Sequence, residues 1–182
     1  MAGPPARVPY RPIIGTLAYV WDRRRDQVLL VHRTARAEDE HLGKYNGLGG
    51  KLEADEDVVS SLRRELREEA AIEVVRFSLR GTISWPGFGA DGTDWFGFVF
   101  VVQEWSGTVP AHNAEGTLHW VPRSRLLEGC SDDERVRERA ALPMWEGDRF
   151  FLPLVFDDDP RPFSAVMPYE GGRPIRWSYS RG

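Results

Sequence analysis

The stretch from residue 44 to residue 70 constrains the fold more than any other part of this 182-residue chain. Residues 44–51 read Lys-Tyr-Asn-Gly-Leu-Gly-Gly-Lys, which is too rich in glycine for an ordinary strand and indicates that the backbone approaches another group closely. Residues 56–70 have apolar side chains at positions 59, 62, 66 and 70, and this spacing predicts a helix with one apolar stripe. A close backbone approach is therefore expected directly before an amphipathic helix.

The predicted helix carries glutamates on one face. Glu65, Glu68 and Glu69 stand at positions i, i+3 and i+4, so their carboxylates lie close together on a helix. Like charges at this spacing repel, whereas Mg²⁺ or Mn²⁺ would use the cluster as a set of hard oxygen ligands. The alternative is a solvated acidic face with local ion pairs such as Arg64 with Glu68. For an acidic helix taken alone, this alternative is favoured.

Composition excludes several classes of function. The formal net charge of −4 argues against a generally basic nucleic-acid binder and against a polybasic membrane-surface protein. Cys130 is the only cysteine, so the chain has neither an internal disulfide nor a multi-cysteine zinc site. The apolar runs are too short to cross a membrane, and the first residues lack the pattern of a signal peptide. We therefore expect a soluble, cytoplasmic protein with a flexible segment over residues 1–10 and a single domain over residues 11–182.

Other elements are expected from the alternation of apolar and polar residues. The expected strands cover residues 13–21, 27–32, 76–85, 95–104 and 118–121, and a terminal hairpin joins residues 164–167 to residues 174–179. The charged segment 123–141 is expected to be helical in part, and residues 148–156 have a helical period although they contain Pro153. The histidines show no ligand spacing and are expected at structural or surface positions.

The helix and its lead-in match a longer pattern. From Gly50, Glu56 follows after five residues, Arg64-Glu65-Leu66 after seven more, Glu68-Glu69 after one, and Ile72 after two. This spacing resembles the Nudix box, the signature of Nudix hydrolases, and a match this long is a strong signal. Ala71 stands where the box has glycine, at the expected helix C-terminus. The resemblance covers about residues 12–179. It implies the α/β (α+β) class, as a Nudix-type α/β/α sandwich with a curved mixed sheet between the Nudix helix and a C-terminal helix.

The resemblance also implies a catalytic site. It assigns Mg²⁺, with Mn²⁺ as a possible substitute, to Glu65, Glu68, Glu69 and the carbonyl of Gly50, with Arg64 orienting the carboxylates through Glu56. The family reaction is hydrolysis of a nucleoside diphosphate linked to another group, in which water attacks a phosphorus atom. Either Glu65 or Glu69 would position or deprotonate that water, and the sequence does not choose between them.

Similarity continues outside the box. Residues 44–51 are similar to the segment before the box in MutT-like enzymes that remove oxidised purine nucleotides. Residues 115–122 resemble a segment of human-type and MutX-type 8-oxo-dGTP diphosphatases, in which Glu115 would supply a further metal ligand. The alternative interpretation of Glu115 is an acidic residue in a surface loop without a metal-binding role. Residues 145–151 resemble the MutX-type sequence near the base pocket, and the human type has two aspartates where this chain has Gly147-Asp148.

The resemblance assigns a set of residues to the substrate. Trp145 would stack on a purine, Asn46 and Asp148 would bind the base edge, and Lys51 and Phe151 would add further contacts. Core packing is the alternative for both aromatic residues, and turn chemistry before Gly47 is the alternative for Asn46.

The implied function is Mg²⁺-dependent hydrolysis of purine nucleoside triphosphates such as 8-oxo-dGTP to a monophosphate and pyrophosphate. Alternatives within the fold are a general nucleoside triphosphate hydrolase, an ADP-ribose or sugar-nucleotide diphosphatase, an isomerase of diphosphate substrates, and a nucleotide-binding regulator without turnover. The intact glutamates argue against the regulator. The expected partner is a small nucleotide bound by a monomer, with no nucleic-acid polymer and no membrane.

Overall fold

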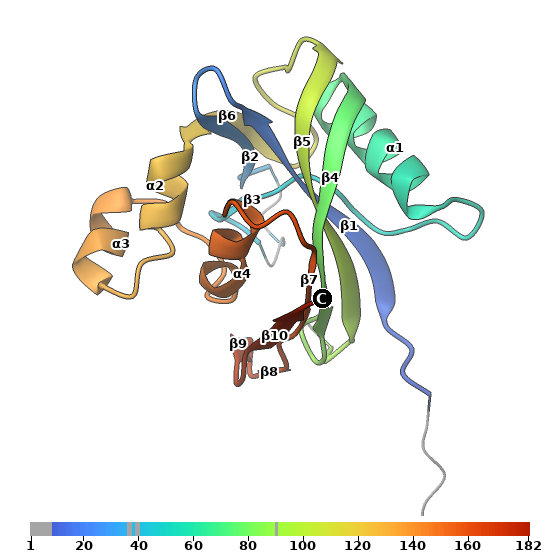
Figure 1. Ribbon diagram of the computed structural model, residues 1–182, viewed down its shortest axis with the longest axis vertical. Coiled ribbons are helices and arrows are strands. Elements are labelled where there is room, and N and C mark those ends of the chain that lie inside the picture. Colours follow the sequence, from blue (N-terminus) through green and yellow to red (C-terminus); the bar gives the residue numbers. More distant parts are fainter. Residues whose placement is uncertain (1–8, 36–37, 39–40, 90) are drawn as a thin grey trace, which may run out of the picture.

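The computed structural model describes residues 9–35, 38, 41–89 and 91–182, and these form a mixed sheet between two layers of helix (Figure 1). Helix α1 (Val58–Ala70) covers one face of the sheet. Helices α2 (Arg123–Glu128), α3 (Glu134–Ala140) and α4 (Asp148–Val155) lie on the side of the other face. This arrangement confirms the expected sandwich and the partly helical charged segment.

The described residues form an eight-stranded sheet with the order β10-β7-β4-β5-β1-β2-β3, and β6 pairs with β2. Pairs β1–β5 and β4–β7 are parallel, and the other pairs are antiparallel. The strands are β1 (Ile13–Asp22), β2 (Gln27–Arg33), β3 (Tyr45–Asn46), β4 (Ile72–Trp85), β5 (Trp95–Gly107), β6 (Gly116–Pro122), β7 (Phe163–Val166) and β10 (Ser178–Arg181).

Several boundaries and the form of the terminal hairpin differ from the sequence-based expectation. Strand β4 begins at Ile72, because residues 72–75 already alternate between buried and exposed positions. The expected terminal hairpin is nested: β7 pairs with β10, while β8 (Tyr169–Glu170) and β9 (Arg173–Pro174) form a small ladder of their own between them. Of the segment expected to be flexible, residues 1–8 lie outside the described residues, and the Tyr10 hydroxyl lies 2.7 Å from Ser84 Oγ.

The core lies on both faces of the sheet, because successive side chains of a strand point to opposite faces. On β1, Ala18 and Val20 pack with the apolar stripe of α1. Tyr19, from the same strand, packs on the opposite face with residues of α4 such as Phe151 and Leu152. Alternate side chains of β1 therefore face the α1 layer and the α4 layer.

Helix α1 begins two residues later than the sequence indicates. Asp57 is its N-cap, and its Oδ1 accepts hydrogen bonds from the N–H groups of Val59 (2.8 Å) and Ser60 (3.1 Å). Glu56 therefore precedes the helix. At the other end Ala71 is the C-cap, with φ 54° and ψ 37°, which is the left-handed conformation that glycine adopts most easily.

Replacing Ala71 with glycine should raise the free energy of unfolding by about 1 kcal/mol, because a Cβ in the left-handed region carries a steric penalty that glycine lacks. Urea unfolding followed by tryptophan fluorescence measures this change. Ala70→Gly is the matched control, since Ala70 is fully buried inside the helix and its replacement should lower stability. A lower midpoint for Ala71→Gly would contradict the capping argument.

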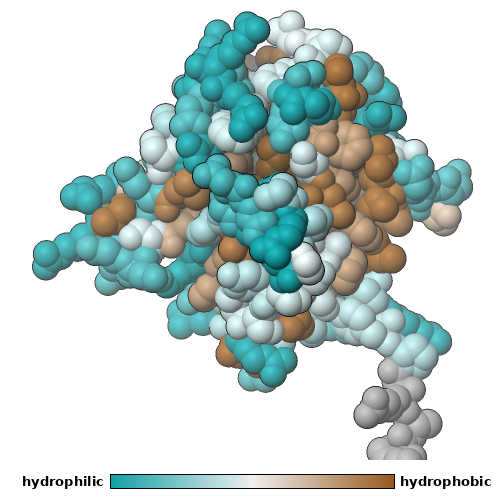
Figure 2. Space-filling model, in the orientation of Figure 1, coloured by the Kyte–Doolittle hydropathy of each residue, from teal (hydrophilic) through white to brown (hydrophobic). Residues whose placement is uncertain are grey.

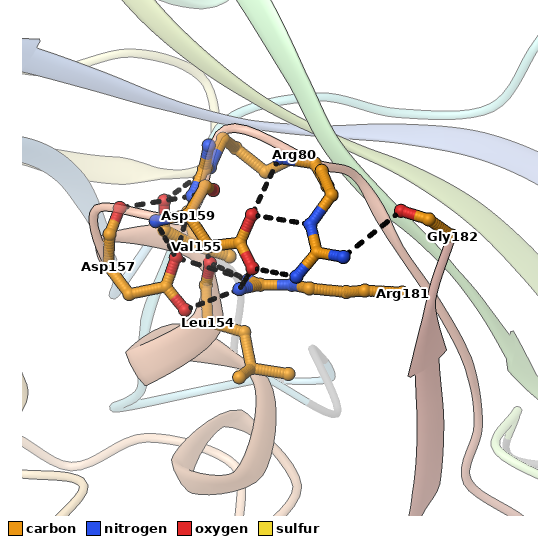
Figure 3. A network of polar contacts seen from close by, with 8 residues as sticks. Arg80, Leu154, Val155, Asp157, Asp159, Arg181 and Gly182 are labelled. Carbon is orange, nitrogen blue, oxygen red and sulfur yellow. Dashed lines mark hydrogen bonds and ion pairs between the residues drawn. The ribbon is translucent and has the colours of Figure 1, made fainter.

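The C-terminal end of α4 is held by a guanidinium (Figure 3). Arg80 of β4 is 8% exposed, and it donates hydrogen bonds to the carbonyl oxygens of Val155 (2.8 Å), Leu154 (3.2 Å) and Asp159 (2.8 Å). The carbonyls of Leu154 and Val155 belong to the last turn of the helix and have no partner within it, so a cation placed here satisfies them. Arg181 of β10 donates to Leu154 as well, which ties the last strand to the same point. The network fixes the direction of α4, whose first residue is Asp148.

The surface is uneven in character. Figure 2 shows apolar residues gathered over the strands beside α1, while the region of α2 and α3 is mostly hydrophilic. Within the described residues, the helices are too short or too polar for any of them to span a bilayer.

Candidate active site

Arg64 organises the acidic face of α1. Its guanidinium forms a two-point contact with the Glu56 carboxylate, through Nε (3.0 Å) and Nη2 (2.6 Å), and its Nη1 donates to Glu65 Oε1 (2.9 Å). The same group donates to the backbone carbonyl of Lys51 (3.2 Å). Because the guanidinium stabilises the charged carboxylate, it lowers the pKa of Glu56 to about 2. Arg64 thereby connects the lead-in loop to the helix and fixes the position of the Glu65 carboxylate.

Glu65 is buried, at 9% exposure, and lies directly against Gly50. A Cβ added at Gly50 would stand 2.7 Å from Glu65 Cδ, which is closer than carbon atoms tolerate. The glycine-rich lead-in expected from the sequence thus brings its backbone against a carboxylate. Burial removes water from this carboxylate and raises the pKa of Glu65.

Glu69 lies one turn further along the helix. Its Oε2 accepts a hydrogen bond from the N–H of Gly49 (2.9 Å). Burial, followed by repulsion from Glu115, raises the pKa of Glu69 to about 8. Negative charge is therefore crowded at this point, where Glu115 approaches the helix from a distant part of the chain.

Two polar residues that the sequence analysis did not select bring Glu115 into place. Asn113 donates from Nδ2 to the Glu69 carbonyl (3.1 Å), and its Oδ1 accepts from the N–H groups of Glu115 (2.9 Å) and Gly116 (3.0 Å). Arg33, at the end of β2, forms an ion pair with the Glu115 carboxylate. The β2–β6 register pairs Arg33 with Gly116, so this contact follows from strand pairing, which the sequence alone did not reveal.

The expected metal ligands are brought together unequally. Glu69 interacts electrostatically with Glu115 and Glu65, and Glu65 with Glu68, but the Glu68 side chain is 59% exposed and lies 3.4 Å from Arg64 Nη1. Across the described parts of the chain, no three carboxylate, histidine or cysteine groups converge closely enough to chelate an ion. The donor set still fits a hard divalent cation, since it consists of carboxylates and a carbonyl, and the crowded charge at Glu69 is what such a cation relieves.

A cavity of about 470 Å³ opens beside these carboxylates. Gly49, Gly50, Lys51 and Glu115 line it at the acidic end. The rest of its wall is mainly aromatic and comes from segments spread along the chain: Tyr19, His41, Trp85, Phe88, Trp95, Trp145, Phe151 and Tyr169. One continuous cavity thus joins an aromatic pocket to Glu115 and to the glycine-rich loop that contacts Glu65 and Glu69 of α1.

Trp145 and Asn46 meet through a histidine. The indole N–H of Trp145 donates to His41 Nδ1 (2.8 Å), and Asn46 Nδ2 lies 3.0 Å from the same atom. Lys44 Nζ stands 4.4 Å from the centre of the Trp145 ring, as a cation–π contact. His41 was expected at a structural or surface position, and it lies instead in the cavity wall.

Asp148 begins α4 and faces the cavity. Its Oδ2 accepts a hydrogen bond from the Trp145 N–H (3.1 Å), and burial raises the pKa of Asp148 to about 7. Phe151, one turn later, is 1% exposed and packs edge-on against Trp85 with ring centres 6.2 Å apart. Phe151 is therefore a core residue that also lines the cavity. Lys51 Nζ lies 5.6 Å from the centre of the Trp95 ring.

Comparison with known proteins agrees with this geometry. The profile of the NUDIX domain matches residues 11–141. Nudix hydrolase YvcI of Bacillus subtilis is 32% identical over 132 residues, which is 71% of this chain and 72% of that protein. The fold is similar to the mutator MutT protein of Bacillus halodurans, with a TM-score of 0.72 and 26% identity over 92% of this chain and 97% of that chain.

A more distant structure shares the fold. The Nudix domain of Shewanella oneidensis NrtR, which was crystallised with ADP-ribose, has a TM-score of 0.54 and 18% identity over 65% of this chain and 78% of that chain. The family profile covers most of this chain, and the box residues lie together around Glu65. The chain therefore belongs to the Nudix family of hydrolases, which act on pyrophosphate bonds and generally use divalent metal cations.

Proposed function

We propose that this Nudix hydrolase converts purine nucleoside triphosphates, with oxidised forms such as 8-oxo-dGTP among them, to a monophosphate and pyrophosphate. The observation that carries the proposal is the continuous cavity. Its aromatic end contains Trp145, Asn46 and Asp148, and its acidic end contains Gly50 and Glu115. A base can stack at the first end while its phosphates reach the second, and the reaction would remove oxidised nucleotides from the cellular pool.

The residues of the chain would divide the work as follows. Glu65, Glu69 and Glu115, with Glu68 and the Gly50 carbonyl, would hold Mg²⁺ or Mn²⁺. When bound, the ion supplies charge neutralisation of the diphosphate and of its transition state. Glu65 or Glu69 positions the attacking water, and Lys51 adds positive charge to the cavity wall.

Arg64 is a positioning residue in this scheme, since it contacts Glu65 and Glu56 rather than the cavity. We infer that one monomer, acting as a single domain over residues 11–182, supplies every group named, and that it works on small nucleotides in the cytoplasm. ADP-ribose is the second candidate substrate, because the Nudix domain of NrtR was crystallised with it.

Steady-state kinetics with 8-oxo-dGTP, dGTP, GTP, dCTP and ADP-ribose, with chromatography of the products, test the proposal. We expect monophosphate and pyrophosphate from the purine nucleotides and loss of turnover when EDTA removes the metal. A tenfold higher kcat/KM for 8-oxo-dGTP than for dGTP, equivalent to about 1.4 kcal/mol, would assign the enzyme to oxidised nucleotides. Similar values for dGTP and GTP would indicate a general hydrolase. Activity on ADP-ribose alone would overturn the base-pocket assignment of Asn46 and Asp148.

A further inference from the structure

Tyr169 reaches into the space beside Gly147, next to Asp148. A Cβ added at Gly147 would overlap the Tyr169 hydroxyl and would lie 2.9 Å from Met167 Cε. The absence of a side chain at position 147 therefore makes room for a phenol. The human-type sequence has an aspartate where this chain has Gly147, and here the neutral hydroxyl group of Tyr169 takes the place of that second carboxylate.

The position of Tyr169 is well defined. Its N–H donates to the Pro86 carbonyl (2.8 Å), and its ring packs edge-on against Phe88 with ring centres 5.0 Å apart. Gly87, at φ +73°, passes so close that an added Cβ would stand 2.7 Å from the Tyr169 carbonyl oxygen. The hairpin of β8 and β9 is thus anchored to the loop after β4, and the phenol is held at the cavity wall.

The hydroxyl is a donor without a partner. Tyr169 is 6% exposed and lines the cavity, and within the described residues its hydroxyl makes no hydrogen bond. Burial and the nearby charge of Asp148 raise the pKa of this phenol, so the group keeps its proton at neutral pH. Because Tyr169 lines the cavity, a bound ligand with an acceptor atom at this point can take a hydrogen bond from the hydroxyl.

We propose that Tyr169 determines base specificity by donating a hydrogen bond to the C6 oxygen of a 6-oxopurine, while Asp148 accepts one from the neighbouring ring N–H. The inference rests on the proposed function, since it specifies the base that the cavity selects. The polar set favours guanine over adenine. The Asp148 carboxylate and the Asn46 amide oxygen are acceptors, and the Tyr169 hydroxyl is a donor. The edge of guanine matches this set, because it offers two donor groups and one acceptor. Adenine does not match it, because it carries an amino donor at C6.

Tyr169→Phe is a clean test, because the ring contacts with Phe88 remain and only the hydroxyl is removed. Quenching of the cavity tryptophans gives dissociation constants without metal or turnover, with GMP and with the monophosphate of purine riboside, which lacks the C6 oxygen as well as the N1–H and the 2-amino group. We expect the wild type to bind GMP about tenfold more tightly than the purine riboside nucleotide. The variant should lose about tenfold in GMP affinity and bind the purine riboside nucleotide unchanged. Tyr179→Phe is the control, since Tyr179 is 50% exposed and lies outside the cavity wall.

Equal affinities of wild type and Tyr169→Phe for GMP would overturn the inference. A loss of GMP affinity in Tyr19→Phe rather than in Tyr169→Phe would also overturn it, since Tyr19 is a second phenol of the cavity wall. Loss of affinity for both ligands alike would also overturn it, because that pattern indicates a packing role. The proposed hydrolysis is judged separately by the wild-type kinetics, so binding that depends on Tyr169 in a chain without turnover would refute the hydrolysis and keep the specificity.

Discussion

Replacing Glu69 with glutamine is expected to lower kcat about 10³-fold, because a neutral amide removes several kcal/mol of transition-state stabilisation at the proposed metal site. The substitution keeps the size of the side chain, and its amide oxygen can still accept the hydrogen bond from the Gly49 N–H that now reaches Glu69 Oε2. Crowding against Glu115 is relieved at the same time, so the fold should be no less stable. The effect is therefore expected in turnover rather than in folding.

Two measurements separate an enzyme from a nucleotide-binding regulator. Product chromatography gives kcat, and quenching of Trp85, Trp95 and Trp145 in the cavity wall gives nucleotide affinity. Affinity for the nucleoside monophosphate should change by less than about threefold, since Glu69 lies at the acidic end of the site. Glu73→Gln is the matched control, because Glu73 is an exposed partner of Arg67 just beyond the same helix. Turnover by Glu69→Gln at the wild-type rate would show that the Glu69 carboxylate is not needed for the reaction.

The acidic face was predictable because its geometry is local. Helical spacing alone places Glu65, Glu68 and Glu69 together, and the box resemblance added Arg64 and Glu56 as partners, which the structure joins by direct hydrogen bonds. The individual strands and helices were predictable for a similar reason, since each carries its own period of burial, whereas the layered arrangement followed from the resemblance to the Nudix family. Helix and strand ends were less accurate, because Asp57 caps α1 through its side chain and β4 extends past the apolar run.

The wall of the cavity was harder to foresee because it is assembled from distant segments. His41 accepts from Trp145, Arg33 pairs with Glu115, and Tyr169 fills the space at Gly147. None of these contacts follows from spacing along the chain. Each depends on which strands are neighbours and on where α4 is anchored, which is information that only the folded arrangement contains.

Gly50→Ala should leave the fold intact and lower kcat about 10²-fold, because it displaces the Glu65 carboxylate, to which we assign a role in catalysis. Gly50 is not among the glycines with positive φ, so alanine fits its backbone conformation. The new methyl group would stand 2.7 Å from Glu65 Cδ, and this flexible side chain is the group that must move. Its contacts with Arg64 would then be lost, and with them the position of the Glu65 carboxylate.

The neighbouring glycine provides the contrast that makes this result interpretable. Gly49 has φ +135°, and a Cβ there would overlap the backbone oxygen of Thr16 and stand 2.9 Å from the Thr16 carbonyl carbon. Backbone cannot yield as a side chain does, so Gly49→Ala should lower the free energy of unfolding by about 3 kcal/mol. Urea unfolding and kcat measured on both variants distinguish the two roles. If Gly50→Ala instead kept wild-type turnover, the position of the Glu65 carboxylate would not matter for catalysis. If it unfolded as readily as Gly49→Ala, Gly50 would serve packing rather than the placement of Glu65.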